Sequence, residues 1–377
     1  MPVKYVFYSL ALVITGFLSC REEYLPPVLT SGNNFLVVEG ILNGGTDSTI
    51  IRLSRTRNLS DTTFDIPELD AGVLVEARTG GNYALSSIGN GLYGAILPIQ
   101  NNETYRLRIS TRSGGLYESE YIAVKNTPAI DSITWKQDVD LTIFLNTRDI
   151  QNRTRYYRWD YTETWEYRSY YDTNLGFDYF SNTIFFRDST QQIHKCWSTA
   201  RSNQVLLGTT DNLSQDIVKD YPITKILNGD FKVDTRYSIL VKQYALSKQE
   251  FQYWQLLKKN AKELGSIFGT QPAELISNIK CISNPAEPVI GYIGASSVSE
   301  KRIFISNNQL QNWDSRGTQD ILCTPVVAPR DSISDYLQRD NSLSPAYFIT
   351  GGGLALAKRT CVDCRIRGGN TQKPSFW

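Results

Sequence analysis

Two side-chain types that often carry chemistry or adaptable packing are almost absent from this sequence. The 377 residues include one histidine, His194, and one methionine, Met1. Because imidazole is the side chain that ordinarily titrates near neutral pH, a single histidine argues against histidine-based catalytic triads and multi-histidine metal sites. His194 stands beside Lys195 and Cys196 in an expected strand, which favours an exposed position on a sheet edge. We therefore expect no metal and no catalytic histidine.

The motifs of common nucleotide-binding and hydrolytic folds are also absent. No G-x-S-x-G, P-loop or G-x-G-x-x-G pattern joins an expected strand to an expected helix. With 39 Lys and Arg against 38 Asp and Glu, the formal charge is +1 and no long basic run occurs, so nucleic acid is not an expected partner. Carboxylates such as Asp160, Glu163 and Glu166 keep a glycan-active enzyme as an alternative, but we expect a protein without catalytic residues or cofactor.

The chain begins with a segment that is too short to cross a membrane and is typical of an export signal. Lys4 precedes an apolar run over Val6–Leu18, whereas a membrane span needs about 20 residues. Ser19-Cys20 then resembles the lipobox of bacterial lipoproteins, which predicts removal of residues 1–19 and lipid on Cys20. An ordinary cleaved signal and a single membrane anchor are the alternatives. Arg21-Glu22-Glu23 resembles a surface-export signal or is a solvated charge cluster, so the membrane leaflet stays open.

Short strand patterns and turn residues dominate the rest of the chain. Between residues 34 and 125, apolar alternating runs are separated by Gly- and Asn-rich turns, which is typical of an immunoglobulin-like β-sandwich. A lipid-anchored tether at 20–33 precedes it, and a second β-rich domain at 129–377 follows. Near 247–264 a capping box and an apolar stripe predict an amphipathic helix. The predicted fold is mainly β, with two β-sandwich-like domains, one amphipathic helix and, from residue 307, a long ordered C-terminal tail.

A long alternating segment, Tyr157–Tyr167, is the most regular element of the second domain. Period two over this length predicts a strand with one buried face. The aromatic residues of that face, which also carries Glu163, are Tyr157, Trp159, Tyr161, Trp165 and Tyr167. The segment that follows falls in an expected loop, where exposed rings are suited to contact with a ligand or partner. The residues predicted to make that contact are Tyr170, Tyr171, Phe177 and Tyr179.

Five cysteines remain if Cys20 carries lipid. They are Cys196, Cys281, Cys323, Cys361 and Cys364. An exported chain permits up to two disulfide bonds and one free or intermolecular thiol, and the sequence leaves the pairing open. The C-x-x-C spacing at 361–364 also suits metal or redox chemistry, but neither a second C-x-x-C nor a thioredoxin-like context accompanies it. We predict that both of its cysteines are oxidised, either to each other or to two of the others.

Several longer motifs stand out against this background. They are the ending Cys361–Trp377, the pair Cys196-Trp197, the stretch Tyr237–Leu246, Trp254, and Pro288–Tyr292 before Ser296. Together they resemble a family of Bacteroidota lipoproteins known as domain of unknown function 4249. The resemblance implies an outer-membrane lipoprotein with a non-catalytic binding or accessory role beside a TonB-dependent receptor. A structural or adhesion protein of the cell surface is the competing class. The family implies no catalytic residues, so none are assigned.

Overall fold

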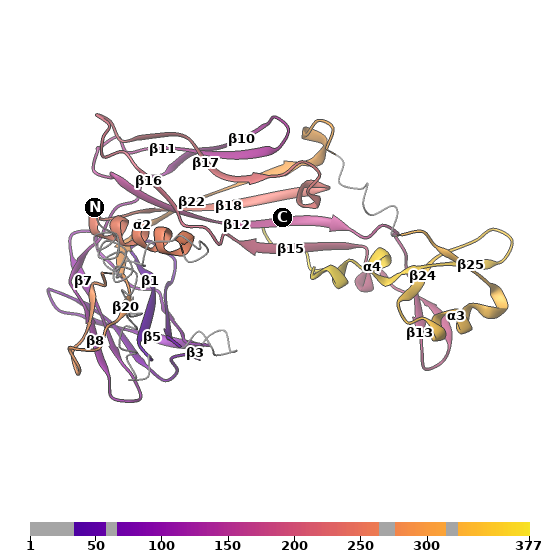
Figure 1. Cartoon of the computed structure of the whole chain (residues 1–377), viewed down its shortest axis with the longest axis horizontal. Helices are drawn as coiled ribbons and strands as arrows, with labels where there is room; N and C mark the ends of the chain where they lie inside the picture. Colours follow the sequence, from indigo (N-terminus) through magenta and orange to yellow (C-terminus); the bar gives the residue numbers. More distant parts are fainter. Residues whose placement is uncertain (1–33, 58–65, 264–275, 314–322) are drawn as a thin grey trace, which may run out of the picture.

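The computed structural model describes residues 34–57, 66–263, 276–313 and 323–377. Its elements are β-strands with few helices, so the prediction of a mainly β fold is confirmed. Figure 1 shows three regions: an N-terminal domain, a second domain above it, and a smaller region at the far right that we call the distal module. No helix in the described ranges is both long and apolar enough to span a bilayer. The expected export segment, Cys20 and the tether lie outside the described residues.

The N-terminal domain is a single sheet path that folds over on itself around one core. Its strands come mostly from the start of the chain: β1 (Leu36–Asn43), β2 (Thr49–Arg55), β3 (Ile66–Pro67), β4 (Gly72–Ala77), β5 (Asn82–Gly89), β6 (Leu92–Ala95), β7 (Thr104–Ser110), β8 (Leu116–Ser119) and β9 (Ile122–Ala123). In β4, for example, the alternate residues Val73 and Val75 are buried, because neighbouring side chains point to opposite faces of the sheet.

Three further strands of this domain come from far along the chain. They are β19 (Ile279–Cys281), β20 (Ile290–Gly291) and β21 (Gly294–Ser296). β19 pairs antiparallel with β8, whereas β20 and β21 pair parallel with β1. We expected the segment that contains these strands to belong to one continuous second domain at 129–377. The structure differs, because this segment returns to the N-terminal domain and buries Ile279, Ile293 and Ala295 in its core.

The second domain packs two sheets face to face. One contains β10 (Ile130–Gln137), β11 (Leu141–Arg148) and β17 (Ile217–Ile226). The other contains β12 (Tyr156–Arg168), β15 (Lys195–Arg201), β16 (Leu206–Thr209), β18 (Arg236–Ala245) and β22 (Val298–Ser306). Their facing side chains form one core, in which Trp159, Tyr237 and Leu145 are almost fully buried. Two packed sheets of this kind are a β-sandwich-like arrangement.

The predicted helix is present as α2 (Lys248–Glu263) and begins at the junction of the first two domains. The backbone N–H of Glu250 donates to Ser247 Oγ (3.1 Å), as the capping pattern predicts. The Glu250 side chain is 5% exposed. A Cβ on Gly294 of β21 would collide with the Glu250 carboxylate, so glycine permits the close approach of helix and strand. Burial raises the pKa of Glu250 to about 7, against the opposing attraction of Arg158.

The distal module is formed by two segments that are separated in sequence. The first contributes the hairpin β13 (Leu175–Asp178) and β14 (Thr183–Phe186); the second contributes β23 (Val326–Pro329), α3 (Ile333–Arg339), β24 (Leu343–Phe348), β25 (Gly353–Lys358), α4 (Arg359–Val362) and the 3-10 turn η6 (Cys364–Arg367). The hairpin packs against the sheet β23-β25-β24 around Leu175, Leu354 and Leu337. We expected ordered loops that wrap the second domain. The structure instead has a small folded unit at its end (Figure 1).

Candidate interaction surface

The aromatic face of β12 belongs to the core of the second domain. Tyr157, Trp159, Trp165 and Tyr167 are each at most 8% exposed, and Tyr161 is half-buried. Trp159 Nε1 donates to Gln243 Oε1 (2.8 Å). Buried indole and phenol groups need such partners, because an unpaired polar atom is costly away from water. The predicted buried face is therefore confirmed, and these rings are not available to a ligand.

Glu163 shares that buried face and has both carboxylate oxygens occupied. Tyr237 Oη donates to Oε1 (2.7 Å), and Lys232 Nζ donates to Oε2 (2.9 Å). Burial and the neighbouring carboxylate raise the pKa of Tyr237 well above its ordinary value. Asp160 and Glu166 are an odd number of residues away on the same strand, so they point to its opposite face. The three carboxylates considered for glycosidic chemistry thus do not flank a common position.

His194 lies in a small polar cluster instead of on an empty sheet edge. Its Nδ1 is 3.0 Å from Ser169 Oγ and 3.3 Å from the Tyr171 carbonyl, and its Nε2 is 3.9 Å from Asp172 Oδ2. The residues match a serine–histidine–aspartate triad in composition but not in hydrogen-bond direction. Ser169 Oγ donates to the Tyr171 carbonyl oxygen (2.9 Å), so its proton is not directed at the imidazole that would have to remove it. The hydrogen bonds of this cluster hold the chain in position where β12 ends.

No local pattern indicates this cluster, because Ser169 and His194 are 25 residues apart and meet only through the register of β12 and β15. A cavity of about 510 Å³ opens beside His194 and is lined in part by Arg187 and Lys195. Burial, with a contribution from nearby Arg365, lowers the pKa of Arg187. Its Nη1 donates to the Leu175 carbonyl (2.7 Å), so part of this guanidinium serves to hold the hairpin β13–β14.

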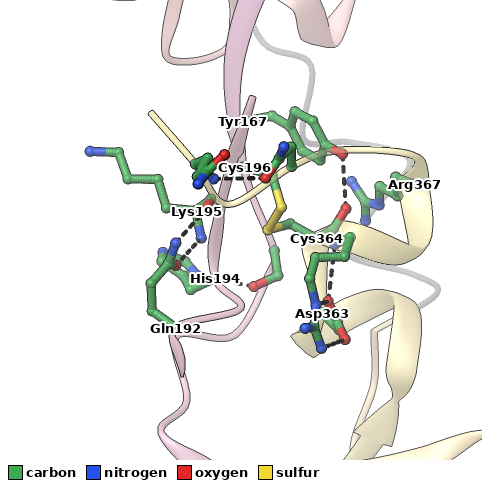
Figure 2. The surroundings of a disulfide bond; sticks show 12 residues. Tyr167, Gln192, His194, Lys195, Cys196, Asp363, Cys364 and Arg367 are labelled. Atoms are coloured by element: carbon green, nitrogen blue, oxygen red, sulfur yellow. Dashed lines mark hydrogen bonds and ion pairs between the residues drawn. A yellow bond between two sulfur atoms is a disulfide. The ribbon is translucent and has the colours of Figure 1, made fainter. Parts of the chain in front are cut away.

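Within the described residues, two disulfide bonds hold the C-terminal segment: one joins it to β15, and the other closes a loop inside the segment itself. Cys196 pairs with Cys364 and Cys323 pairs with Cys361, with Cα–Cα distances of 5.8 and 5.7 Å. The two cysteines of the C-x-x-C sequence are therefore oxidised to different partners, while Cys281 is buried and unpaired. Figure 2 shows Cys364 beside Tyr167, whose hydroxyl donates to the Cys364 carbonyl (2.8 Å). Within the described residues, no group of three or more His, Cys, Asp or Glu is placed to hold a metal.

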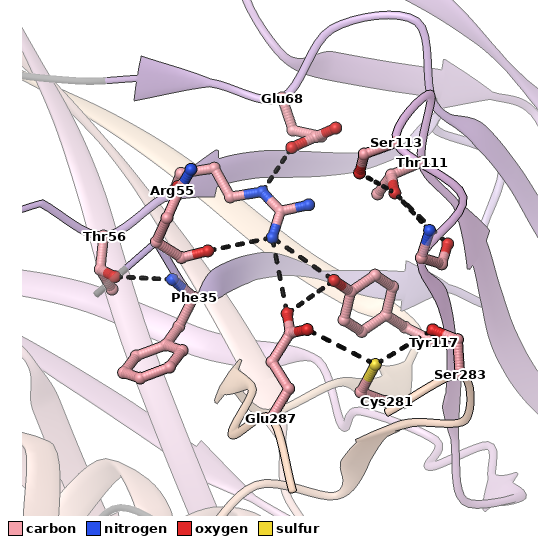
Figure 3. Close-up of polar contacts among 12 residues, drawn as sticks. Phe35, Arg55, Thr56, Glu68, Thr111, Ser113, Tyr117, Cys281, Ser283 and Glu287 are labelled. Carbon is pink, nitrogen blue, oxygen red and sulfur yellow. Dashed lines mark hydrogen bonds and ion pairs between the residues drawn. The ribbon is translucent and has the colours of Figure 1, made fainter. Parts of the chain in front are cut away.

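A larger cavity lies at the edge of the N-terminal domain, but its charged groups are paired with one another. Its volume is about 1160 Å³. Figure 3 shows Arg55 between Glu68 and Glu287, with the Arg55–Glu287 ion pair at 3.6 Å. Tyr117 Oη donates to Glu287 Oε1 (2.7 Å), and burial together with this carboxylate raises the pKa of Tyr117 to about 12. Since Glu287 belongs to the returning segment, the cluster fastens that segment to β2 and β8.

The distal module, in contrast, leaves large aromatic side chains in solvent. Phe180 is 98% exposed, Phe186 is 66% exposed and Phe348 is 56% exposed. The rings of Phe186 and Phe348 lie 6.3 Å apart, and Tyr179 packs edge-on against Phe177 at 4.9 Å. We define the distal aromatic surface as Tyr179, Phe180, Phe186 and Phe348. Several exposed aromatic rings on one small folded unit are typical of an interaction site.

The four residues predicted to contact a partner all lie in or beside the distal module, but they differ in exposure. Tyr170 and Tyr179 are exposed. Tyr171 is half-buried: its hydroxyl donates to the Cys323 carbonyl (2.7 Å), and its N–H donates to the Cys361 carbonyl (2.9 Å). Phe177 is not in a loop but in β13, where it packs on the hairpin core. Tyr171 and Phe177 therefore support the fold, and the expectation that Phe177 lies in a loop is wrong.

Sequence reasoning missed most of the distal aromatic surface. Phe180 is adjacent to Tyr179 and could have been included from its position alone. Phe186 and Phe348 are 162 residues apart and meet only through the packing of β14 and β24. The four residues of β14, Thr-Ile-Phe-Phe, are too few and too uniform for alternation to indicate that Phe186 is exposed.

Comparison with known proteins finds one family. The family described as "Domain of unknown function (DUF4249)" matches residues 21–302. The ending Cys361–Trp377, which contributed to the resemblance, lies beyond the matched residues. No curated protein matches the chain. A chain from the solved structure described as "Cytokine receptor complex - Crystal form 2" has 11% sequence identity over 55% of this chain and 90% of its own length, with a TM-score of 0.19. A likeness that weak supports no conclusion.

Proposed function

We propose a function on the premise that the chain belongs to the family described as Domain of unknown function (DUF4249), whose description names no activity. The protein is a non-catalytic binding component of the cell envelope. It is held to the outer membrane by lipid on Cys20 and contacts a partner protein through the distal aromatic surface. The resemblance noted above makes a TonB-dependent receptor the expected partner.

The exposure of the distal aromatic surface carries this proposal. Exposed Phe and Tyr side chains leave apolar area in water, whereas the same residues give much of the binding energy when a partner covers them. The second domain buries the aromatic face of β12, and its exposed rings Phe231 and Phe376 are less than half exposed, so exposure as strong as that of Phe180 is not a general property of the chain. Figure 1 also places the distal module at the end of the molecule away from the N-terminal domain. A membrane anchor that precedes β1 would therefore leave this surface free to reach a partner.

The partner contact is tested by purifying the native membrane complex with affinity-tagged protein. The double variant Phe180→Ala and Phe186→Ala should retain less than about a tenth of the co-purifying partner, because loss of two central aromatic contacts costs at least about 1.4 kcal/mol. Ile96→Ala in the N-terminal domain is the matched control, since Ile96 is an exposed apolar side chain away from the distal module. Equal recovery of the partner by the double variant and the control would contradict the proposal. Release of sugar from envelope glycans by pure protein would instead favour the enzymatic alternative.

The anchor is tested separately. Cys20 follows the export segment directly, so Cys20→Ser should abolish labelling of the protein with a clickable palmitate analogue, while Cys281→Ser should leave labelling unchanged. Undiminished labelling of the Cys20 variant would rule out this residue as the lipid site. Wild-type protein found only in the inner membrane would contradict the outer-membrane assignment.

A further inference from the structure

The hairpin of the distal module has one strand edge whose backbone groups face outward. The Arg187 N–H donates to the Asn174 carbonyl (2.6 Å), which makes this a hydrogen-bonded pair. The register pairs Gly176 with Phe185 and Leu175 with Phe186. In an antiparallel ladder, hydrogen-bonded and non-hydrogen-bonded pairs alternate. The N–H and C=O groups of Phe185 therefore point toward β13, whereas those of Ile184 and Phe186 point away from it.

The outward groups of Ile184 and Phe186 have no hydrogen-bond partner among the described residues. β13 and β14 form a two-stranded sheet, so within the part of the chain that the structure describes no strand covers the outer edge of β14. Edge strands are usually guarded by proline or by charged side chains, especially lysine. The sequence of β14, Thr-Ile-Phe-Phe, contains neither. Among the features that protect edge strands from pairing with other chains, β14 itself has only a short length.

We propose that an extended segment of the partner protein adds as a strand to the outer edge of β14. This inference rests on the function proposed above and specifies how the partner binds. Two outward residues, spaced about 7 Å apart along the strand, present alternating donors and acceptors that another polypeptide backbone matches. The Phe186 and Phe348 rings lie beside that edge and supply a side-chain contact that distinguishes one partner sequence from another.

The charges near the hairpin favour a polypeptide over a bilayer as the occupant. Asp178 ends β13 and Asp188 follows β14, and hydrogen bonds from neighbouring groups lower the pKa of both carboxyls, so they are ionised at neutral pH. Asp178 lies next to the hairpin turn and Asp188 beyond the opposite end of β14, and carboxylates at both places are repelled by an anionic lipid surface. Acyl chains also offer no partners for the open N–H and C=O groups of Ile184 and Phe186.

Position 186 allows the backbone contribution to be separated from that of the ring. Phe186→Ala and Phe186→Pro both remove the aromatic side chain. Only proline also removes the outward N–H and places its ring in the path of an added strand. Because the hairpin does not use this N–H, proline is compatible with an edge position here and leaves the β13–β14 ladder intact.

The experiment uses full-length lipoprotein in living cells, with the photo-cross-linker p-benzoylphenylalanine replacing Tyr179. On irradiation, protein with Phe186 should give one discrete adduct with another protein. The Phe186→Pro chain should give at least tenfold less adduct than the Phe186→Ala chain. Equal yields from the Ala and Pro chains would overturn strand addition while leaving partner binding in place. An adduct with lipid or within the chain itself would also overturn it, and no adduct with any protein would overturn the proposed function as well.

A measurement without substitutions guards against misfolding of the proline variant. In purified free protein, the amides of Ile184 and Phe186 should exchange with deuterium rapidly, since nothing in the described chain bonds them. In the purified membrane complex they should exchange at least tenfold more slowly, while the amide of Phe185 changes little. Unchanged exchange at Ile184 and Phe186 in the complex would overturn the proposed strand addition.

Discussion

The N-terminal domain and the distal module achieve stability in different ways. The N-terminal domain is a twelve-stranded sheet around one large apolar core, to which the segment that returns beyond residue 276 adds Ile279, Ile293 and Ala295. The distal module has two small clusters, and one of them surrounds the Cys323–Cys361 disulfide. The distal module compensates for its small core with a disulfide bond. The distal module also leaves Phe and Tyr rings exposed to solvent. In the N-terminal domain, by contrast, the charged groups at the cavity are paired with one another.

The largest expected effect comes from the core of the N-terminal domain. Leu53 is fully buried, so Leu53→Ala should lower the free energy of unfolding by about 2–5 kcal/mol through lost transfer energy and the remaining cavity. Leu337→Ala in the distal module, also fully buried, should cost less because a smaller cluster can collapse around the gap. Urea unfolding of both variants checks this order. A larger loss for Leu337→Ala would break the comparison.

The disulfide of the distal module should carry the next largest effect. Replacing both Cys323 and Cys361 by Ser removes a cross-link with a sequence separation of 38, which should destabilise the module by about 2–4 kcal/mol. Amide exchange should rise in β23–β25 and stay unchanged in β1–β8. Cys281→Ser, which breaks no disulfide, is the control. Equal exchange in the double variant and the control would show that the small core suffices by itself.

The junction between the first two domains should respond to pH. Because the folded pKa of Glu250 is raised from 4.5 to about 7, the unfolded chain binds fewer protons between these values, and stability falls as pH rises through this window. The Glu250→Gln variant should show a weaker pH dependence. Above pH 7, its free energy of unfolding should exceed that of the wild type by up to about 3 kcal/mol. Unfolding at pH 5 and pH 8 checks this, with the exposed Glu39→Gln as the charge control. Parallel profiles of wild type and Glu250→Gln would contradict the assignment.

The smallest stability effects separate surface aromatic residues from packing ones. Phe180→Ala should change the free energy of unfolding by less than about 0.5 kcal/mol, since the ring is almost fully exposed. Tyr171→Phe removes the hydroxyl that donates to the Cys323 carbonyl and should cost about 1 kcal/mol. Thermal unfolding of the two variants measures the difference. A larger loss for Phe180→Ala would mean that the tip of the hairpin belongs to the fold.

Local patterns predicted those elements whose form depends on neighbouring residues. Alternation along Tyr157–Tyr167 gave the strand and its buried face, and the capping pattern at Ser247 gave the start of α2. Such signals act over a few residues, because strand pleat and helix capping are local geometry. The presence of disulfides in the C-terminal segment also followed from composition and export.

Features that depend on distant partners could not be predicted in this way. The alternation at Val289–Ser296 indicates a strand but not which sheet it joins, so its return to β1 was missed. The disulfide partners of Cys361 and Cys364 could not be predicted for the same reason, because each partner is distant in the sequence. Phe186 and Phe348 are exposed because the distal core is too small to cover them, which no pattern in β14 or β24 records.

The returning segment also sets an order in which the protein can mature. β1 and β8 gain their outer neighbours only after residues 279–296 have been synthesised, about 160 residues later than β8 itself. Until then both strands expose unpaired edges that can pair with other chains. The incomplete N-terminal domain therefore has to be kept from such pairing throughout synthesis of the second domain. A fragment that stops after residue 126 would retain that vulnerability permanently.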